Sequence, residues 1–447
     1  MNLLTNGRVI TRDEGGKGYY EKGAVAYEGT KIVEVGEEAA LRAKYPQAEI
    51  IDAKGGVIMP AFINAHTHIY SALARGLSIV GNNPTNFYEV LDGTWWAIDR
   101  HLMMDGTKAS ATALYMDSIK QGVTTIFDHH AAYCEIPGSL FQIGESAKKF
   151  GIRSCLCYEV SDRDGEEKCL QAIKENADWI TYCEQQKDPM LAAMFGGHAL
   201  FTISDKTFDR MVAANNGRTG YHIHVSEGMN DVYDSLQNYG RRPVQRLQDH
   251  GILGEKTILG HCIHVNTAEM EIIKETGTMV VNNPESNMGN AIGICPVLQL
   301  HKRGILLGMG TDAYTNDMLE SLKVALCSQR SQNCLPNVGW CEVTDMLFKN
   351  NAKIGEKYFP ATLGVLKSGA AADIIVMDYK PFTPFSDENI DGHMIFGMTG
   401  RQCQTTIANG KVLMQDRVLV GIDEEAENAH ILEAAKKLWG DLNHRVY

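Results

Sequence analysis

The central part of the chain alternates short apolar runs with stretches whose apolar residues recur at helical spacing. Eight apolar runs have the length of a buried strand, and they begin at residues 57, 122, 153, 194, 220, 257, 278 and 304. Between them lie segments such as 107–122 and 267–277, which carry apolar residues three or four positions apart and end in glycine. Strands that alternate with helices in this way predict a parallel sheet with crossover helices.

Eight strand–helix units over roughly 250 residues have the number and the length of a (β/α)8 barrel. We therefore predict an α/β fold in which residues 57–366 form a TIM-like barrel. An open doubly wound sheet is the alternative. It has less support, because no Gly-x-Gly-x-x-Gly segment follows an early strand.

The two ends of the chain have a different pattern, with short alternating strands and tight turns. Residues 1–56 and 367–420 are both rich in hairpins, and Asn409-Gly410 is a two-residue turn signal. We predict that these two segments pair into one small β-sandwich. Residues 421–447 form a C-terminal helix that packs on the body, with an apolar face made of Ile431, Leu432, Ala435, Leu438 and Trp439.

Composition and charge narrow the choice of partners. The 447 residues include 42 basic and 55 acidic side chains, which gives a net charge of −13. An acidic surface disfavours nucleic acid and anionic membranes as partners, and no window approaches the roughly 18 apolar residues of a membrane span. We therefore expect no nucleic-acid and no membrane partner.

Cysteine usage and the N-terminus bear on location. The eleven cysteines show no disulfide spacing, and the first twenty residues carry charges and glycines where a signal peptide needs an apolar core. These features predict a reduced, cytoplasmic protein. A homodimer is the expected assembly, because twofold dimers are the commonest oligomers.

Histidines and a carboxylate stand at the ends of the predicted strands, where barrel enzymes carry their chemistry. The residues at these ends are His66 and His68 (strand 1), His198 (strand 4), His224 (strand 5), His261 (strand 6) and Asp312 (strand 8). Residues two apart share a strand face, and imidazoles with a carboxylate suit Zn²⁺ or Fe²⁺. The sequence thus predicts one divalent metal ion on four ligands: His66, His68, His224 and Asp312.

Each of these signals has a plain alternative. A lone His-x-His pair is weak, and His222-Ile223-His224 is a second such pair, although one strand face does not obviously serve both. Asp312 could simply cap the helix that follows its strand. The combination of suitable residues at strands 1, 5, 6 and 8 favours the metal site.

Several segments extend this pattern to a known family. The segments "PAFINAHTH", "HVSEGMND", "GHCIHV" and "GMGTDAYTND" resemble the signatures of the amidohydrolase superfamily, in the branch of mononuclear metal-dependent deaminases. Within it, "WWAIDRHL", "FDHHAAY", "HALFTISD" and "NNPESNMGN" are similar to the SsnA-type aminohydrolases.

The resemblance implies the reaction and the catalytic residues. It implies an aminohydrolase that replaces an exocyclic amino group of a small nitrogen heterocycle (a purine, pyrimidine, pterin, aminoimidazole or triazine) by hydroxyl, with release of ammonia. Asp312, Glu227 and His261 would handle protons and polarise the reacting atoms. Binuclear relatives use a strand-4 lysine, and "MFGGHALFTIS" has none, so one metal is expected. Zinc is the first choice, with iron and manganese as alternatives.

Substrate contacts are predicted at His198, His130, Trp95 and Asn287. His198 resembles a substrate-contacting position of related deaminases, and His130 follows strand 2. Trp95 lies in an aromatic loop after strand 1, where it could stack on a flat ring or fill the core of the loop itself. Asn287 after strand 7 could contact a ring edge or cap the next helix.

Two other functions remain open. A cyclic amidohydrolase, as in imidazolone-type relatives, would use the same residues to open a heterocyclic ring. A non-catalytic homologue would use the barrel as a scaffold, but such relatives typically lose metal ligands, and this chain retains the predicted set.

Overall fold

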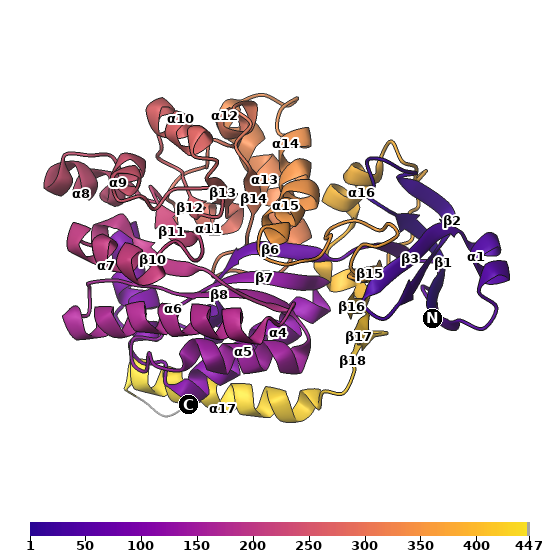
Figure 1. Ribbon diagram of the computed structural model, residues 1–447, viewed down its shortest axis with the longest axis horizontal. Helices are drawn as coiled ribbons and strands as arrows, with labels where there is room; N and C mark the ends of the chain where they lie inside the picture. Colours follow the sequence, from indigo (N-terminus) through magenta and orange to yellow (C-terminus); the bar gives the residue numbers. More distant parts are fainter. Residues whose placement is uncertain (445–447) are drawn as a thin grey trace.

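A closed barrel of parallel strands forms the centre of the molecule (Figure 1). In the computed structural model, which describes residues 1–444, two parallel sheets have the orders β6-β7-β8-β9 and β10-β11-β12-β13-β14. Bridges between Thr67 and Asp312 and between Val160 and Gly197 join the two sheets. The strands are β6 (Phe62–Thr67), β7 (Val123–His130), β8 (Arg153–Tyr158), β9 (Leu191–Ala193), β10 (Phe195–Ala199), β11 (Tyr221–Val225), β12 (Ile258–His261), β13 (Met279–Asn282) and β14 (Leu307–Met309). The predicted fold class is confirmed.

Helices cover the outside of the barrel, as the alternating pattern predicts. The main ones are α4 (Met104–Lys120), α5 (Ser139–Phe150), α6 (Glu166–Gln186), α7 (Asp205–Asn215), α8 (Met229–Tyr239), α9 (Pro243–Asp249), α10 (Thr267–Glu275), α11 (Pro284–Gly289), α12 (Val297–Lys302), α13 (Met318–Asn333), α14 (Trp340–Asp345) and α15 (Asn351–Glu356). In α10, Asn266 and Glu269 form a capping box, and Met270 and Ile273 are buried against the strands.

The first apolar run contributes to two sheets rather than one. Its start is β5 (Val57–Pro60), which belongs to the terminal sheet, and the barrel strand β6 begins only at Phe62. At the crossing, the Ala61 amide donates to the Asp373 carbonyl at 3.1 Å and the Phe62 amide to the Gly122 carbonyl at 2.9 Å. Both halves are buried, so hydropathy alone does not show where the chain changes sheet.

The side chain of Asn351 bonds to both strands at the seam, the place where β6 and β14 meet and close the barrel. Its amide nitrogen donates to the carbonyls of Ile63 (2.7 Å) and Met309 (2.8 Å), and its oxygen accepts from the Met309 amide at 2.8 Å. These bonds link β6 with β14. The strand ends that follow carry His66 and Asp312, so Asn351 supports their relative register.

Both ends of the chain join in one nine-stranded sheet, with the order β18-β17-β16-β15-β5-β1-β2-β3 and β4 paired with β1. The strands besides β5 are β1 (Asn2–Ile10), β2 (Tyr19–Glu28), β3 (Lys31–Glu37), β4 (Glu49–Asp52), β15 (Ile374–Met377), β16 (Cys403–Ala408), β17 (Lys411–Gln415) and β18 (Val418–Leu419). Antiparallel pairing of β5 with β15 unites the N- and C-terminal segments. This sheet lies to one side of the barrel (Figure 1).

The C-terminal helix α17 (Glu424–Asn443) packs against α4 along the lower edge of the molecule in Figure 1. Ala434 and Leu438 are buried there, and the Trp439 indole nitrogen donates to the Leu73 carbonyl at 2.8 Å. Leu432, which was assigned to the apolar face, is 56% exposed, because the buried line follows residues 431, 434, 435 and 438 and leaves Leu432 on its flank.

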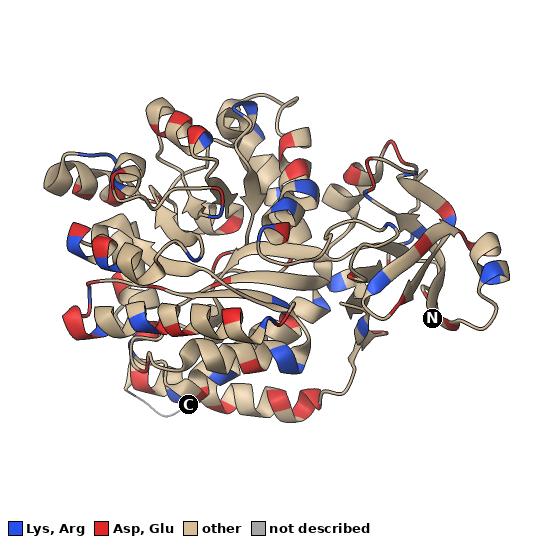
Figure 2. Cartoon of the chain, in the orientation of Figure 1, with Lys and Arg blue, Asp and Glu red and all other residues tan. Residues whose placement is uncertain are grey.

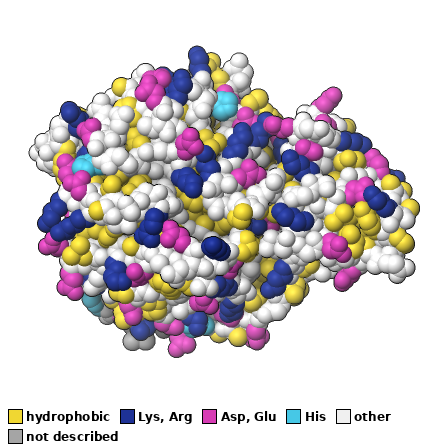
Figure 3. Space-filling model, viewed as in Figure 1, with side chains coloured by type: hydrophobic (Ala, Val, Ile, Leu, Met, Phe, Trp, Pro, Cys, Tyr) yellow, Lys and Arg dark blue, Asp and Glu magenta, His cyan; other side chains and the backbone are white. Residues whose placement is uncertain are grey.

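Charged side chains lie mostly on the outer helices and loops, and basic and acidic residues are interspersed in this view (Figure 2). The space-filling view shows the same mixture, with hydrophobic side chains scattered between the charges (Figure 3). No helix within residues 1–444 is long and apolar enough to span a bilayer.

Candidate active site

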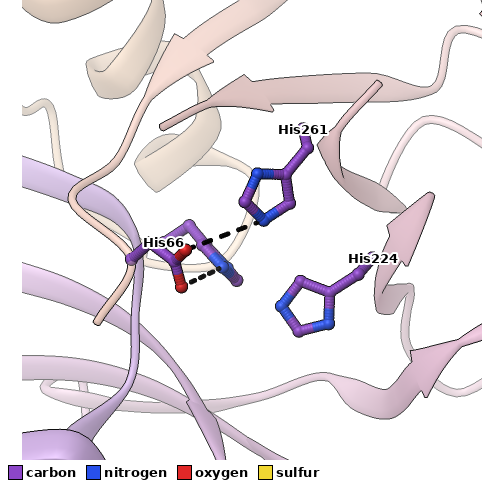
Figure 4. A group of neighbouring side chains, drawn as sticks. His66, His224 and His261 are labelled. Carbon is purple, nitrogen blue, oxygen red and sulfur yellow. Dashed lines mark ion pairs between the residues drawn. The ribbon is translucent and has the colours of Figure 1, made fainter. Parts of the chain in front are cut away.

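Four imidazoles and one carboxylate converge at the C-terminal ends of the barrel strands. One ligand atom each from His66, His224, His261 and Asp312 lies within 4.8 Å of the others. His68 joins this cluster, because its Nε2 lies 2.7 Å from Asp312 Oδ1 and 3.3 Å from His224 Nε2. Figure 4 shows His66, His224 and His261 around one centre, with dashed lines for the ion pairs of 3.7 and 3.9 Å that Asp312 makes with His66 and His261. The structure thus groups three of the predicted ligands, His66, His224 and Asp312, and places the fourth, His68, in contact with Asp312 and His224.

The hydrogen bonds made by Nδ1 of His68 and His224 determine the tautomer of each ring. His68 Nδ1 lies 2.6 Å from the His129 carbonyl and His224 Nδ1 lies 2.8 Å from the His198 carbonyl. A carbonyl only accepts, so each Nδ1 carries the hydrogen and, in the neutral ring, each Nε2 presents its lone pair inward.

The centre therefore lacks a positive charge. Two imidazole lone pairs face each other at 3.3 Å beside the Asp312 carboxylate, and such acceptors repel unless a cation stands between them. Two nitrogens bound about 2.0–2.1 Å from a tetrahedral ion would stand about 3.3 Å apart. The same demand for positive charge acts on His68: burial lowers its pKa, but the Asp312 carboxylate outweighs burial and raises it to about 9, so a proton on His68 takes the place of a cation when none is bound. The donor set fits a divalent metal ion.

His222 resolves the ambiguity of the second His-x-His pair. It lies on the same strand face as His224 but one layer deeper in the barrel, where its Nε2 is 2.8 Å from His66 Nδ1. His66 Nε2 is buried without a hydrogen-bond partner in the described structure. His222 therefore orients a predicted ligand rather than serving as one.

Asp312 is held by its backbone and by Ser286. Its amide donates to the His66 carbonyl at 3.0 Å, its φ of +56° lies in the left-handed region, and the Ser286 hydroxyl donates to Oδ2. Burial would raise the pKa of Asp312, but the neighbouring imidazoles, with His68 foremost, hold it well below its ordinary value. The carboxylate stays anionic.

Glu227 stands in the loop after β11. Asp231 shapes this loop by accepting from the Ser226 amide at 2.7 Å and from the Phe201 amide at 3.1 Å. Glu227 Oε1 lies 3.5 Å from His261 Nε2. Burial raises the pKa of Glu227 well above its ordinary value, and the Asp312 charge adds to this effect. A carboxyl group in this setting is suited to donate a proton.

His261 is oriented by Asn287. Asn287 Oδ1 lies 2.7 Å from His261 Nδ1, and Asn287 Nδ2 donates to Asn282 Oδ1 at 3.0 Å. His261 Nδ1 therefore donates, and the neutral ring directs its Nε2 lone pair toward Glu227 and Asp312. Asn287 lies behind His261 and is not among the residues that line the cavity.

A cavity of about 30 Å³ adjoins the cluster. Its walls are His68, Tyr70, Phe87, Leu91, Trp95, Trp96, Glu159, His198, His224, Glu227, Asn290, Asp312 and Ala313. This volume suffices for no more than a few water molecules, so a heterocycle needs the walls of the cavity to move apart. An outer pocket of about 340 Å³ shares Trp95 and Ala313 with the cavity.

The four predicted substrate contacts differ in position. Trp95 and His198 line the cavity. His130 does not; its ring lies beside Tyr158 and Tyr70, and both its nitrogens are buried without a hydrogen-bond partner within residues 1–444. A substrate contact of His130 would need that ring to move, and this assignment stays a prediction, as does that of Asn287.

Glu159 lines the cavity but was not among the predicted site residues. It follows β8 directly, and its side chain is 3% exposed. Burial would raise its pKa, but His198, His129 and Arg163 hold it below the ordinary value. The alternation of Cys155, Cys157 and Glu159 was the signal that could have found it, because it places Glu159 on the inward face at the strand end.

The amidohydrolase family model matches residues 57–413, most of the chain. The chain belongs to the amidohydrolase family. A second model, the bacterial imidazolonepropionase-like composite domain, matches residues 23–48 of this amidohydrolase. The predicted superfamily is confirmed, and with it the predicted class of hydrolase, acting on carbon–nitrogen bonds other than peptide bonds.

Curated relatives resemble this amidohydrolase over nearly its whole length. A 5'-deoxyadenosine deaminase of Methanosarcina mazei is 29% identical, with 99% of each chain covered. A 5-methylthioadenosine/S-adenosylhomocysteine deaminase of Thermococcus sibiricus is 31% identical, with 92% of this chain and 93% of the relative covered. The deaminase names of these relatives agree with the predicted reaction.

Solved structures support the fold of this amidohydrolase. A zinc-bound adenosine deaminase of Xanthomonas campestris superimposes with a TM-score of 0.85 at 22% identity, covering 98% of each chain. The guanine deaminase of E. coli has a TM-score of 0.78 at 18% identity, covering 93% of this chain and all of that one. At these identities the likeness establishes the architecture.

Proposed function

We propose that this amidohydrolase is a metal-dependent deaminase that replaces an exocyclic amino group of a small nitrogen heterocycle by hydroxyl and releases ammonia. One observation carries the proposal. The acceptor atoms of His68, His224 and Asp312 face one another without a donor or a cation from residues 1–444 between them, and the Glu227–His261 pair lies beside them. The deaminase names of the relatives give further support.

His66, His68, His224 and Asp312 would hold one divalent ion, with zinc as the first choice and iron or manganese as alternatives. Zinc in the Xanthomonas structure supports that choice. A divalent ion at such a centre supplies Lewis acidity and lowers the pKa of water from 15.7 to about 7. The protein side chains transfer the protons and orient the water and the substrate.

Asp312 and His261 handle the attacking water. The Asp312 carboxylate is anionic, and it accepts the proton that the water loses. His261 directs its Nε2 lone pair into the same space, 3.9 Å from Asp312 Oδ2. It therefore accepts a hydrogen bond from the O–H that the water keeps, and this bond orients the oxygen toward the ring carbon.

Glu227 acts at the ring. Burial raises the pKa of its carboxyl group well above the ordinary value, which suits it to donate a proton to the ring nitrogen next to the reacting carbon. This donation removes negative charge as the tetrahedral carbon forms. The proton held by Asp312 then passes to the exocyclic amino group. The carbon–nitrogen bond breaks and ammonia leaves, while the proton of the new hydroxyl returns to Glu227. The ring keeps the oxygen, and both carboxyl groups regain their starting states.

Aromatic side chains form much of the cavity wall. Trp95, Trp96, Phe87 and Tyr70 surround the space next to the catalytic groups, and aromatic faces stack on planar heterocycles. This composition supports a purine, pyrimidine, pterin, aminoimidazole or triazine as the substrate class.

Ammonia release from such heterocycles, with the metal content known, tests the proposal. We expect turnover of at least one aminoheterocycle by the zinc-loaded protein, with an ultraviolet spectrum that keeps the ring absorption. Ring opening of a cyclic amide is the second candidate, because Glu227 and Asp312 could act on such a ring in the same cavity. Loss of the ring absorption without ammonia release would establish ring opening instead and contradict deamination.

The remaining expectations concern assembly and surroundings. Homodimer formation, a cytoplasmic location and the absence of a nucleic-acid partner stay predictions from composition and charge. Size-exclusion chromatography with light scattering tests the first of these: a mass of twice 49.3 kDa is expected, and the mass of one chain would contradict it.

A further inference from the structure

We infer that Glu159 determines substrate specificity, by accepting a hydrogen bond from an N–H or amino group at a ring position other than the reacting carbon. The substrate would then be a heterocycle that carries such a donor in addition to the amino group that leaves, as 2,6-diaminopurine and 2,4-diaminopteridine do. This inference rests on the proposed function and narrows its substrate class.

Glu159 reaches the cavity from a different side than the catalytic groups. It follows β8, whereas Glu227 follows β11 and Asp312 follows β14, and all three line the same cavity. A Glu159 oxygen lies within 4.8 Å of a nitrogen of His224, so a ring whose reacting carbon lies beside Glu227 and Asp312 presents a different but nearby position to Glu159.

One carboxylate oxygen of Glu159 faces His129. His129 Nδ1 lies 3.2 Å from Oε2, while His129 Nε2 lies 3.0 and 3.1 Å from the carbonyls of Gly197 and His222. Because carbonyls only accept, Nε2 carries the ring hydrogen, and a neutral His129 turns a lone pair toward Glu159. A doubly protonated His129 would donate a hydrogen bond to Oε2, but Oε1 would still lack a donor.

The other oxygen, Oε1, faces a second acceptor. Its neighbour His198 Nε2 is 3.6 Å away. The Thr202 hydroxyl donates to the Ala199 carbonyl at 2.9 Å, so His198 Nδ1 is the donor in its 2.7 Å bond to Thr202 Oγ1. The neutral His198 ring therefore presents an acceptor at Nε2. Glu159 and His198 form one wall of the cavity that offers only acceptors.

Arg163 does not donate a hydrogen bond to Glu159 or His198. Its Nη2 lies 3.9 Å from Glu159 Oε1, too far for a hydrogen bond. Its guanidinium is instead paired with buried Asp99 through both terminal nitrogens and lies over the Tyr133 ring at 4.2 Å. The charge of Arg163 therefore acts on Glu159 without a hydrogen bond between them, and Oε1 keeps an acceptor position without a donor toward the cavity.

A buried acceptor without a donor is costly, and a ligand that supplies the donor removes the cost. A ring with only acceptors or C–H groups on that edge would leave Glu159 unpaired. Sites built to bond one polar group reject analogues that lack it far more strongly than sites that sense shape alone. Glu159 should therefore discriminate between heterocycles that differ by a single amino group.

Matched ligand pairs test this without turnover. The zinc-loaded protein is titrated by calorimetry with two pairs of deamination products. The first pair is guanine and hypoxanthine, the products of 2,6-diaminopurine and adenine; the second is pterin and pteridin-4-one, the products of 2,4-diaminopteridine and 4-aminopteridine, and the first member of each pair carries the extra amino group. We expect the amino-bearing member of at least one pair to bind about 10- to 100-fold more tightly. In Glu159→Gln, whose amide can turn a donor to the ligand, this ratio should fall below about threefold at unchanged zinc content.

Glu175→Gln is the matched control. Glu175 is also a buried carboxylate, but it accepts from the Gly138 and Leu140 amides at 2.9 and 3.0 Å outside the cavity. This variant should keep the ratio of the parent protein. Absence of any preference in the parent protein, or a preference that survives in Glu159→Gln, would overturn the inference. Ammonia release from any aminoheterocycle would still uphold the proposed function, so the two failures are distinguishable.

Discussion

The seam between β6 and β14 depends on the buried side chain of Asn351, and its removal has a calculable effect. Asn351→Ala deletes three hydrogen bonds, to the Ile63 carbonyl and to both backbone groups of Met309. No water replaces them easily, because Asn351 and its partners are fully buried or nearly so.

The size of the effect follows from these three bonds. Each unpaired buried group costs about 1–2 kcal/mol, so the free energy of unfolding should fall by about 3–6 kcal/mol. For a chain of 447 residues, an unfolding entropy of about 2.1 cal/mol/K per residue converts this loss into a melting temperature lower by about 3–6 °C. Zinc affinity should fall as well, because the seam sets the register of His66 and Asp312.

The neighbouring Asn350→Ala variant is the control. Asn350 is also buried, but its amide makes a single bond, to the Leu307 carbonyl at 2.9 Å, so the expected shift is about 1 °C. Both variants are compared with the parent protein by differential scanning calorimetry at equal zinc content. If Asn351→Ala melted within 1 °C of Asn350→Ala, the role of the seam would be refuted.

Three further predictions concern the site and its charges. Glu227→Gln should keep the bound metal and lose a factor of about 10²–10⁴ in kcat, as an ammonia assay with metal analysis would show; near-normal turnover would exclude the proton-donor role. Chelation should lower the melting temperature and zinc restore it, with about 2.7 kcal/mol of stabilisation at 100 times Kd; equal melting curves would argue against a metal in the fold. Burial raises the pKa of Glu285 to about 7 from 4.5. Its folded form binds the proton more tightly than its unfolded form, so stability falls as pH rises from about 4.5 to 7; Glu285→Gln should flatten this decline, and an unchanged pH profile of melting temperature would contradict the assignment.

Much of the fold was predictable, because burial on both faces makes barrel strands continuous apolar runs. All eight runs from 57 to 312 contain a barrel strand. The division of the first run at Ala61 was not predictable, since β5 and β6 are equally buried. The exposure of Leu432 on α17 also depends on where α4 lies, which the periodicity of one helix does not specify.

The candidate ligands were predictable, because strand alternation places His66 with His68 on the inward face. Their supporting contacts were not. That His222 lies beneath His66, or that Ser286 bonds to Asp312, depends on the register of neighbouring strands around the barrel. Glu159 was missed because a single carboxylate after a strand is common. Only the barrel geometry shows that it faces the same cavity as Glu227.

The metal centre itself is tested most directly by anomalous diffraction at the zinc edge from crystals of the zinc-loaded protein. We predict one peak, about 2.0–2.2 Å from the Nε2 atoms of His66, His68 and His224 and from a carboxylate oxygen of Asp312. A peak ligated by Glu159 and His198 instead, or no peak among these four side chains, would contradict the account.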